Sequence, residues 1–367
     1  MNEGISLENI TFSRVGGRKI RSRRAPGQGF LFASSGRLAR RLAIASQWEF
    51  GRARHVSAIA LAVLALAACQ PKAASQPPVL KIASQKGGTK SLVLAAHALN
   101  GAPYRVEWSE FPSAQALLEA LSAGAVDAGA VGDAPFIFAY AAGSKIKVVE
   151  ASRSSGGGSS TAVLVRADSP IRTAADLKGK RIATGRGSIG HYLLLRVLER
   201  VGLSPKDVTV VFLSPGDAKA AFGAGSVDAW ATWGSYVGLA QLHDRTRIVA
   251  DGQGLLSGVG FEAANDAAIA AKHAELADFL RRLAQAQRWE ATHRAEYAAV
   301  LAKETGLPRD VALYTVSKVR GVPAPIDASI VAEERETLDH YAKAGVIAAA
   351  PNIEGAFDAS FNASVRP

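Results

Sequence analysis

Residues Ala123–Ala130 read AGAVDAGA, and the same phrase returns 101 residues later as AGSVDAWA at Ala224–Ala231. Each copy follows an amphipathic helical stretch and predicts a glycine that ends a helix, followed by a short β-strand. Each then runs into a turn with ligand-binding potential, Gly132-Asp133 after the first copy and Trp233-Gly234 after the second. A unit repeated once at domain-sized spacing indicates two similar α/β lobes rather than a solenoid. The cleft between two such lobes is a preferred place for a small ligand.

The positive charge of the chain is concentrated near its N-terminus. The formal net charge of the 367 residues is +11, but residues 1–68 carry 11 Lys/Arg against three Glu. The remaining residues carry 32 Lys/Arg against 29 Asp/Glu, which leaves +3. This balance gives no electrostatic case for a nucleic-acid partner, and none is expected.

A short apolar run, Val56–Ala68, is too short to span a bilayer but has the length of a signal-peptide core. It ends in Leu66-Ala67-Ala68-Cys69, which matches the bacterial lipobox, whose cysteine is lipid-modified and becomes the mature N-terminus. An ordinary secretory signal with an incidental cysteine, or a buried structural cysteine, stays open as an alternative. Because Cys69 is the only cysteine, a disulfide within the chain and thiol catalysis by another residue are excluded.

These features predict the organisation of the N-terminal part. Residues 1–50 are expected to be disordered or to lie upstream of the true translation start, and residues 51–68 to be the signal peptide. Residues 69–78, which are polar and contain proline, are expected to be a linker after the lipobox cysteine. Arg40-Arg41 also resembles a twin-arginine signal, but Gln47-Trp48-Glu49 interrupts the apolar stretch that should follow.

From Val79 onward, predicted strands and helices alternate in a βαβ rhythm, which favours mostly parallel sheets flanked by helices. Residues 79–166 are assigned to the first part of lobe 1, 167–258 to lobe 2, and 259–367 to a return into lobe 1 with C-terminal helices. Strands near Thr161–Arg166 and Val259–Ala263 are expected to carry the chain between the lobes. Two such crossings suit hinge closure around a central cleft.

Candidate site residues lie in turns beyond the predicted strand ends, because ligands of open α/β sheets bind there. Backbone N–H groups at a helix start favour an anion, and Ser188 opens one such helix. Phe261 is added from the strand of chain return. The candidates for ligand binding are Gln85, Lys86, Gly132, Asp133, Ala134, Gly187, Ser188, Ile189, Gly190, His191, Asp217, Trp233 and Phe261.

Several of these residues also have plain structural interpretations. Ser188 can cap its own helix as well as donate to a ligand, and Lys86 can be a solvated lysine rather than a cation facing an acidic ligand. Gly185-x-Gly187-x-x-Gly190 has the form of a dinucleotide-binding motif, but its place deep in the second lobe argues against a cofactor, and none is expected. His191 has no partner at ligand spacing, so no metal site is expected. Trp230 and Trp233 lie on opposite faces of a strand; Trp233 is preferred for the cleft.

Several short motifs occur together along the chain. They are Gln85-Lys86-Gly87, Gly132-Asp133-Ala134-Pro135, Asp176-Leu177-Lys178-Gly179-Lys180, Gly187-Ser188 with His191-Tyr192-Leu193-Leu194, and Gly225-Ser226-Val227-Asp228-Ala229-Trp230. Over roughly residues 79–345, this combination resembles the aliphatic-sulfonate-binding proteins of ABC importers, within the nitrate/taurine/sulfonate solute-binding family. The resemblance implies a type II periplasmic-binding-protein fold with two lobes, a hinge and a central cleft, and no catalysis.

The resemblance further implies a small anionic or zwitterionic ligand, an organic sulfonate, that is delivered to a membrane permease and its ATPase. N–H groups near Gly132–Ala134 and Ser188–His191 would hold the anionic head, and Trp233 with Phe261 would cover the organic tail. This chain departs from the family pattern at Ala134, Lys219 and Gly234, where the family commonly has Thr, Arg and Asp. These departures leave the particular anion open.

The sequence therefore predicts an extracytoplasmic, periplasmic and lipid-anchored binding protein that works as a monomer. Two alternatives remain. An enzyme on the same scaffold, of the thiamine-pyrimidine synthesis type, would need a general base such as His191, Asp133 or Asp217. A sensory binding protein for a small anion such as nitrate would present its ligand to a receptor instead of a permease.

Overall fold

The computed structural model describes residues 76–318 and 321–366. The expected extension 1–50, the signal peptide 51–68 and the lipobox residue Cys69 lie outside these residues. Within the described ranges, no helix is both long and apolar enough to cross a membrane.

The first sheet has six strands in the order β11-β4-β10-β3-β1-β2. Its strands are β1 (Val79–Gln85), β2 (Arg105–Phe111), β3 (Ala128–Gly132), β4 (Ile146–Ser154), β10 (Val259–Asn265) and β11 (Gly321–Ala324). Strand β1 pairs in parallel with β2 and β3, whereas β10 lies antiparallel between β3 and β4. The sheet is thus mixed, because the chain returns to it along β10.

The second sheet has five strands in the order β7-β6-β8-β5-β9. Its strands are β5 (Thr161–Arg166), β6 (Arg181–Thr184), β7 (Thr209–Phe212), β8 (Ala229–Trp233) and β9 (Thr246–Asp251). Strand β6 pairs in parallel with β7 and β8, and β5 runs antiparallel to β8 and β9. The sequence assigned residues 79–166 to the first lobe, but β5 belongs to the second sheet because its apolar residues pair with β8 and β9.

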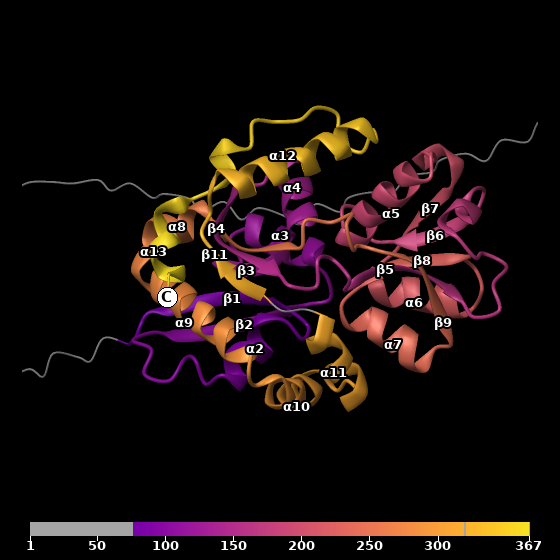
Figure 1. The fold of residues 1–367 in the computed structure, drawn as a ribbon. Helices are drawn as coiled ribbons and strands as arrows, with labels where there is room; N and C mark the ends of the chain where they lie inside the picture. The colour runs from indigo at the N-terminus through magenta and orange to yellow at the C-terminus, as the bar shows by residue number, and fades with distance from the viewer. Residues whose placement is uncertain (1–75, 319–320, 367) are drawn as a thin grey trace, which may run out of the picture. The chain divides into compact units, whose positions relative to one another are not determined.

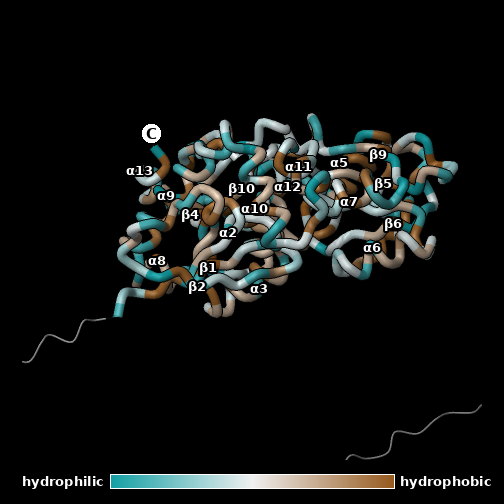
Figure 2. Tube along the Cα trace, turned by 90° about the horizontal axis from the view of Figure 1, so that it is seen from below, coloured by the Kyte–Doolittle hydropathy of each residue, from teal (hydrophilic) through white to brown (hydrophobic). Residues whose placement is uncertain are grey.

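Helices cover both faces of each sheet, and the two sheets lie side by side (Figures 1 and 2). The helices that follow strands of the first sheet, with those of the C-terminal part, are α2 (Thr89–Ala95), α3 (Ala114–Ser122), α4 (Asp133–Ala141), α8 (Asp266–Ala271), α9 (His273–Glu290), α10 (Arg294–Thr305), α11 (Arg309–Lys318), α12 (Ala328–Lys343) and α13 (Asn362–Val365). Those of the second sheet are α5 (Ile189–Arg200), α6 (Pro215–Gly223) and α7 (Ser235–His243). Short 3-10 helices occur at Ala174–Leu177, Pro205–Asp207, Glu354–Ala356 and Ala359–Phe361.

The C-terminal helices were expected to pack back on the first lobe, and α12 does contact α4. Two of them also contact the second lobe. Helix α11 packs against α7, where the Tyr314 ring is so close to Gly238 that an added Cβ would lie 2.9 Å from it. Tyr341 of helix α12 packs against Tyr192 of α5, with ring centroids 5.1 Å apart and the ring planes tilted by 48°. These helices therefore join the two lobes as well as covering one of them.

The repeated phrase makes the same contacts in both sheets. Asp127 accepts the backbone N–H of Lys81 at 2.7 Å, and Asp228 accepts that of Arg181 at 2.8 Å. The backbone N–H of Asp127 in turn donates to the Lys81 carbonyl, and that of Asp228 donates to the Arg181 carbonyl. The carboxylate thereby fixes the register between the strand that follows the phrase and its parallel neighbour. The glycine two residues before the shared valine ends the preceding helix with φ of 72° at Gly124 and 73° at Gly225.

The turn between β6 and α5 needs glycine at two places for reasons of packing. Gly187 has φ of 67°, and a Cβ there would lie 2.3 Å from the Phe138 ring. Gly190 lies against β8, where a Cβ would come 2.6 Å from the Ala231 carbonyl oxygen and 3.0 Å from the Thr184 hydroxyl. The G-x-G-x-x-G pattern is thus explained by a left-handed turn and by close contact between helix and strand.

We expect Gly190→Ala to lower the free energy of unfolding by about 1–3 kcal/mol, because the backbone oxygen of Ala231 cannot move away without disturbing β8. The matched control is Gly216→Ala in the first turn of α6, where an added Cβ meets nothing within 4 Å. That change should be neutral or stabilising by less than about 1 kcal/mol. Urea unfolding of the two variants measures the difference, and equal midpoints would contradict the packing argument.

Candidate functional site

A cavity of about 300 Å³ is lined by residues from both sheets, and it is called the main cavity below. Its lining consists of Gln85, Ala114, Gln115, Ala130, Val131, Gly132, Asp133, Pro135, Ser152, Ser154, Gly158, Ser160, Thr161, Ser188, Ile189, Trp233, Gly234, Leu256, Gly258, Val259, Gly260 and Gly321. Most of these residues lie at or just beyond strand ends. The volume is at the lower end of the range for small-molecule pockets.

Four helices begin at the main cavity. Helix α3 starts at Ala114, α4 at Asp133, α5 next to Ser188, and α7 next to Gly234. In the described part of the chain, the residues that precede α3, α4 and α7 make no side-chain cap bond, although the Asp133 carboxylate accepts the backbone N–H of Ala134 within the first turn of α4. Free backbone N–H groups and the positive ends of the helix dipoles therefore face one space, and this arrangement favours an anion.

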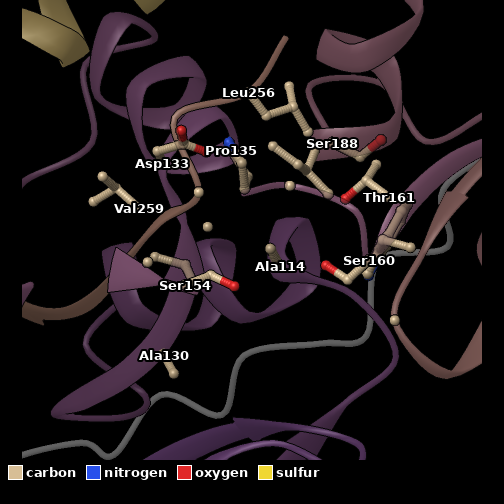
Figure 3. Close-up of a pocket in the computed structure, with 18 of the residues that line it drawn as sticks. Ala114, Ala130, Asp133, Pro135, Ser154, Ser160, Thr161, Ser188, Leu256 and Val259 are labelled. Carbon is tan, nitrogen blue, oxygen red and sulfur yellow. The ribbon is translucent and has the colours of Figure 1, made fainter. Parts of the chain in front are cut away.

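Hydroxyl groups add donors between these helix starts. Ser154 at the end of β4 and Ser160 before β5 turn their hydroxyls toward each other across the cavity, with Thr161 beside Ser160 (Figure 3). Among the lining residues there is no lysine or arginine. An anion in this cavity would be held by neutral donors fixed by the backbone rather than by a mobile cation.

Asp133 is the one charged residue among those that line the main cavity. It is buried, and its carboxylate accepts hydrogen bonds from the Ser257 hydroxyl and, at 2.6 Å, from the backbone N–H of Ala134. Burial raises the pKa of the Asp133 carboxyl, and the hydrogen bonds oppose this shift only in part. The carboxyl is therefore engaged by its own turn and by Ser257, which lies between β9 and β10.

The structure brings six of the predicted site residues into the main cavity and leaves the others outside it. The six are Gln85, Gly132, Asp133, Ser188, Ile189 and Trp233. Trp230 is buried in the core, so the two tryptophans do face opposite sides of β8 as predicted. The remaining candidates, which do not line this cavity, are Lys86, Ala134, Gly187, Gly190, His191, Asp217 and Phe261.

Tertiary packing explains why the predicted residues Ala134, Phe261 and His191 do not line the main cavity. Ala134 is fully buried in the core, and Phe261 packs edge-to-face on Phe136 with ring centroids 5.6 Å apart. His191 is buried in the first turn of α5, where its Nδ1 accepts the backbone N–H of Gly187 at 3.2 Å. His191 and Phe261 thus support the walls of the cavity instead of lining it.

The charged candidates lie elsewhere as well. Lys86 lines an adjoining cavity of about 430 Å³, which shares Gln85 and Trp233 with the main cavity. Asp217 is exposed and accepts the Ser214 hydroxyl at 2.7 Å at the start of α6. Lys219 pairs with Asp244 at 3.3 Å.

Ser188 combines a place at the cavity with a capping role. Its hydroxyl oxygen accepts the backbone N–H of His191 at 3.0 Å and lies 3.4 Å from the hydroxyl of Thr184. Ser188 is also buried. Because its hydroxyl caps α5, replacing it with alanine would lower the free energy of unfolding by about 1 kcal/mol. The Ser188 hydroxyl is therefore already used within the protein.

Sequence reasoning missed Gln115, Ser154, Ser160 and Thr161. The signal for Ser154 and Ser160 was the Gly/Ser-rich stretch 154–160, which was noticed only as an interruption of the βα rhythm. Its hydroxyls face the cavity because the stretch connects the end of β4 to the start of β5, one from each sheet. Throughout residues 76–318 and 321–366, no group of three His, Cys, Asp or Glu side chains is arranged to hold a metal ion.

Comparison with known proteins shows which family shares these features. Residues 106–296 match the family described as NMT1/THI5 like. The chain is 35% identical over 291 residues to an aliphatic sulfonates-binding protein of Escherichia coli (strain K12), an alignment that covers 78% of this chain and 91% of that protein. It is 30% identical over 258 residues to a protein of the same description from Bacillus subtilis (strain 168), with coverage of 70% and 77%.

A solved structure agrees with the sequence comparison. The alkanesulfonate-binding protein SsuA from Xanthomonas axonopodis pv. citri, bound to MOPS, matches with a TM-score of 0.72 and 35% identity. The match covers 78% of this chain and 99% of that one. The likeness therefore extends over both sheets and the helices between which the main cavity lies.

Burial lowers the pKa of His191 to about 4, with a smaller contribution from the charge of Arg186. In the unfolded chain the imidazole takes up a proton near its ordinary pKa of about 6.5, so stability is lost as the pH falls from about 6.5 toward 4. Between pH 7 and pH 5 the wild type should lose about 2 kcal/mol more than His191→Asn, whose amide oxygen can still accept from Gly187. Urea unfolding at the two pH values measures this, and parallel losses would refute it.

Proposed function

This chain belongs to the NMT1/THI5-like family, among the aliphatic sulfonate-binding proteins of ABC importers, and from this premise we propose that it captures a small organic sulfonate outside the cytoplasm. The bound ligand would be delivered to a membrane permease with its ATPase. The observation that carries the proposal is the convergence of four helix starts on one cavity without a lysine or arginine.

A sulfonate fits this donor set because its single negative charge is spread over three oxygens. The N–H groups at the starts of α3, α4, α5 and α7 that no side chain already accepts, and the hydroxyls of Ser154, Ser160 and Thr161, would each take one of these oxygens or a water bound to it. Trp233, Leu256 and Val259 supply apolar walls for the organic tail. Because the donors come from both sheets, a bound ligand would favour an arrangement in which both lobes contact it.

Binding without catalysis is the better-supported function. The similar proteins are named as binding proteins. Of the three bases considered from the sequence, His191 has its Nδ1 engaged with Gly187, and Asp217 lies outside the main cavity. Asp133 accepts hydrogen bonds from the backbone N–H of Ala134 and from the Ser257 hydroxyl. A sensory role would use the same cavity, and the family membership favours the importer over it.

We further propose a periplasmic location with a lipid anchor at Cys69. The proposal rests on the apolar run that ends in Leu66-Ala67-Ala68-Cys69 and on the polar residues that follow it. Residues 69–78 would act as the tether between the membrane and the folded part. A monomer suits a carrier that must dock on a permease.

We expect calorimetric titration of the purified protein to show binding of butanesulfonate and no binding of sulfate or nitrate. Ser160→Ala should weaken sulfonate binding by about 3–10-fold, because within the described residues its hydroxyl makes no hydrogen bond to the protein and is free for the ligand. The control is Ser226→Ala, at an exposed position where the other copy of the repeated phrase has alanine. If no sulfonate gives a binding signal in the titration, the proposed ligand is refuted.

We expect the mature protein from bacterial membranes to begin at a lipid-modified Cys69, which mass spectrometry of the N-terminal peptide detects. Cys69→Ala should move the protein from the membrane fraction to the soluble periplasmic fraction, because alanine has no thiol to carry the lipid and the chain has no other cysteine. An unmodified N-terminus near residue 69 in the wild-type protein would disprove the anchor and leave the binding function untouched.

A further inference from the structure

Two glutamates face each other inside the first sheet. Glu150 on β4 lies directly opposite Glu262 on the antiparallel β10. Both are buried, with 2% and 3% of their surface exposed. Like charges directly opposite on neighbouring strands are destabilising, and burial increases the cost. The pair therefore needs a proton or a cation.

A small cavity lies beside this pair, and it is called the inner cavity below. It has a volume of about 90 Å³, and its polar lining comprises Thr89, Glu150, Ser152, Glu262 and Gln287. Both carboxylate oxygens of Glu150, Oε1 of Glu262 and Oε1 of Gln287 are buried without a hydrogen-bond partner in the described residues. All four atoms are acceptors, and the side-chain donors among the lining residues are the hydroxyls of Thr89 and Ser152 and the amide nitrogen of Gln287. The unpartnered buried atoms of the inner cavity are therefore acceptors.

The inner cavity adjoins the main cavity. Ala130, Ser152 and Gly260 line both of them. A ligand whose anionic head lies among the helix starts therefore has a short path for its other end toward the two glutamates.

No side-chain cation neutralises the pair within the part of the chain that the structure describes. Neither glutamate takes part in a salt bridge there. Arg288 on α9 acts on Glu150 only through its charge, because its guanidinium donates to the Val365 carbonyl. Burial raises the pKa of Glu150 to about 8 despite the opposing charge of Arg288. Burial, and after it the charge of Glu150, raises the pKa of Glu262 well above its usual range.

We propose that Glu150 and Glu262, with the amide oxygen of Gln287, form a binding site for one monovalent cation. The cation is either the ammonium group of a zwitterionic sulfonate or a free alkali ion. The first alternative rests on the proposed function, and the second is independent of it. Two carboxylates and neutral oxygens suit a singly charged hard cation or an ammonium group. A divalent metal is disfavoured because no third His, Cys, Asp or Glu joins the site in the described residues.

Thermal unfolding of the ligand-free protein tests the alkali ion. Potassium or sodium chloride should raise the melting temperature by about 2–4 °C over an equal concentration of choline chloride, whose quaternary ammonium group is shielded by methyl groups and has no N–H to donate. Glu150→Gln and Glu262→Gln keep the shape of the side chain and should each abolish this difference. The exposed Glu107→Gln on β2 is the matched control and should retain it.

Calorimetric titration in choline buffer tests the ammonium group. Homotaurine and butanesulfonate have the same number of heavy atoms and differ by an ammonium for a methyl group. Homotaurine should bind about tenfold more tightly to the wild type and to Glu107→Gln, and the preference should disappear in Glu150→Gln.

The outcomes separate this proposal from the proposed function. An alkali shift or a homotaurine preference that the glutamine variants abolish supports the cation site and identifies its source. The cation site is refuted if the protein binds both sulfonates equally and its melting temperature does not respond to the alkali ion. It is also refuted if the glutamine variants keep the alkali shift or the homotaurine preference. In either case the pair holds a shared proton. If neither sulfonate binds, the proposed ligand is wrong, and the alkali shift alone still decides the cation site.

Discussion

The first turn of an α-helix leaves backbone N–H groups without partners inside the helix, and the binding chemistry of this protein depends on where those turns lie. Helices α3, α4, α5 and α7 each follow a strand, and each begins where that strand ends, at the main cavity. The directions of the strands thus decide which helix ends meet. Because the donors belong to the backbone, they are held in place by the two sheets and lose little conformational freedom when an anion binds.

The repeated phrase shows how much of this arrangement is local and therefore predictable. Its glycine ends a helix, and its aspartate ties the start of the following strand to Lys81 in one sheet and to Arg181 in the other. Such a pattern is visible in the sequence because every residue in it acts within a few positions or through the backbone. The alternation of strands and helices, the two crossing strands and the glycine-rich turns were predictable for the same reason.

The side chains that line the main cavity were less predictable, because they depend on which side of each turn faces the other lobe. Gly187 precedes Ser188, and Gly190 and His191 follow it in the first turn of α5. Contacts with Phe138, with β8 and with the backbone N–H of Gly187, respectively, direct these three residues into the protein. Ser154 and Ser160 show no periodic pattern, and they reach the cavity only because one sheet ends and the other begins around them. Long-range packing of this kind leaves no mark on the nearby sequence.

The polarity of the two neighbouring cavities is complementary, and the complementarity has an electrostatic consequence. The main cavity presents donors and helix N-termini, whereas the inner cavity presents carboxyl and amide oxygens, with Ala130, Ser152 and Gly260 shared between them. Inside a protein, the attraction between opposite charges is weakened less by solvent than at the surface. An anion in the first cavity therefore favours a positive charge in the second, and each lowers the cost of burying the other. A zwitterionic ligand, or an anion together with a cation, places a negative charge in the main cavity and a positive charge in the inner cavity. An anion alone leaves the repulsion between the two glutamates to be relieved by a bound proton.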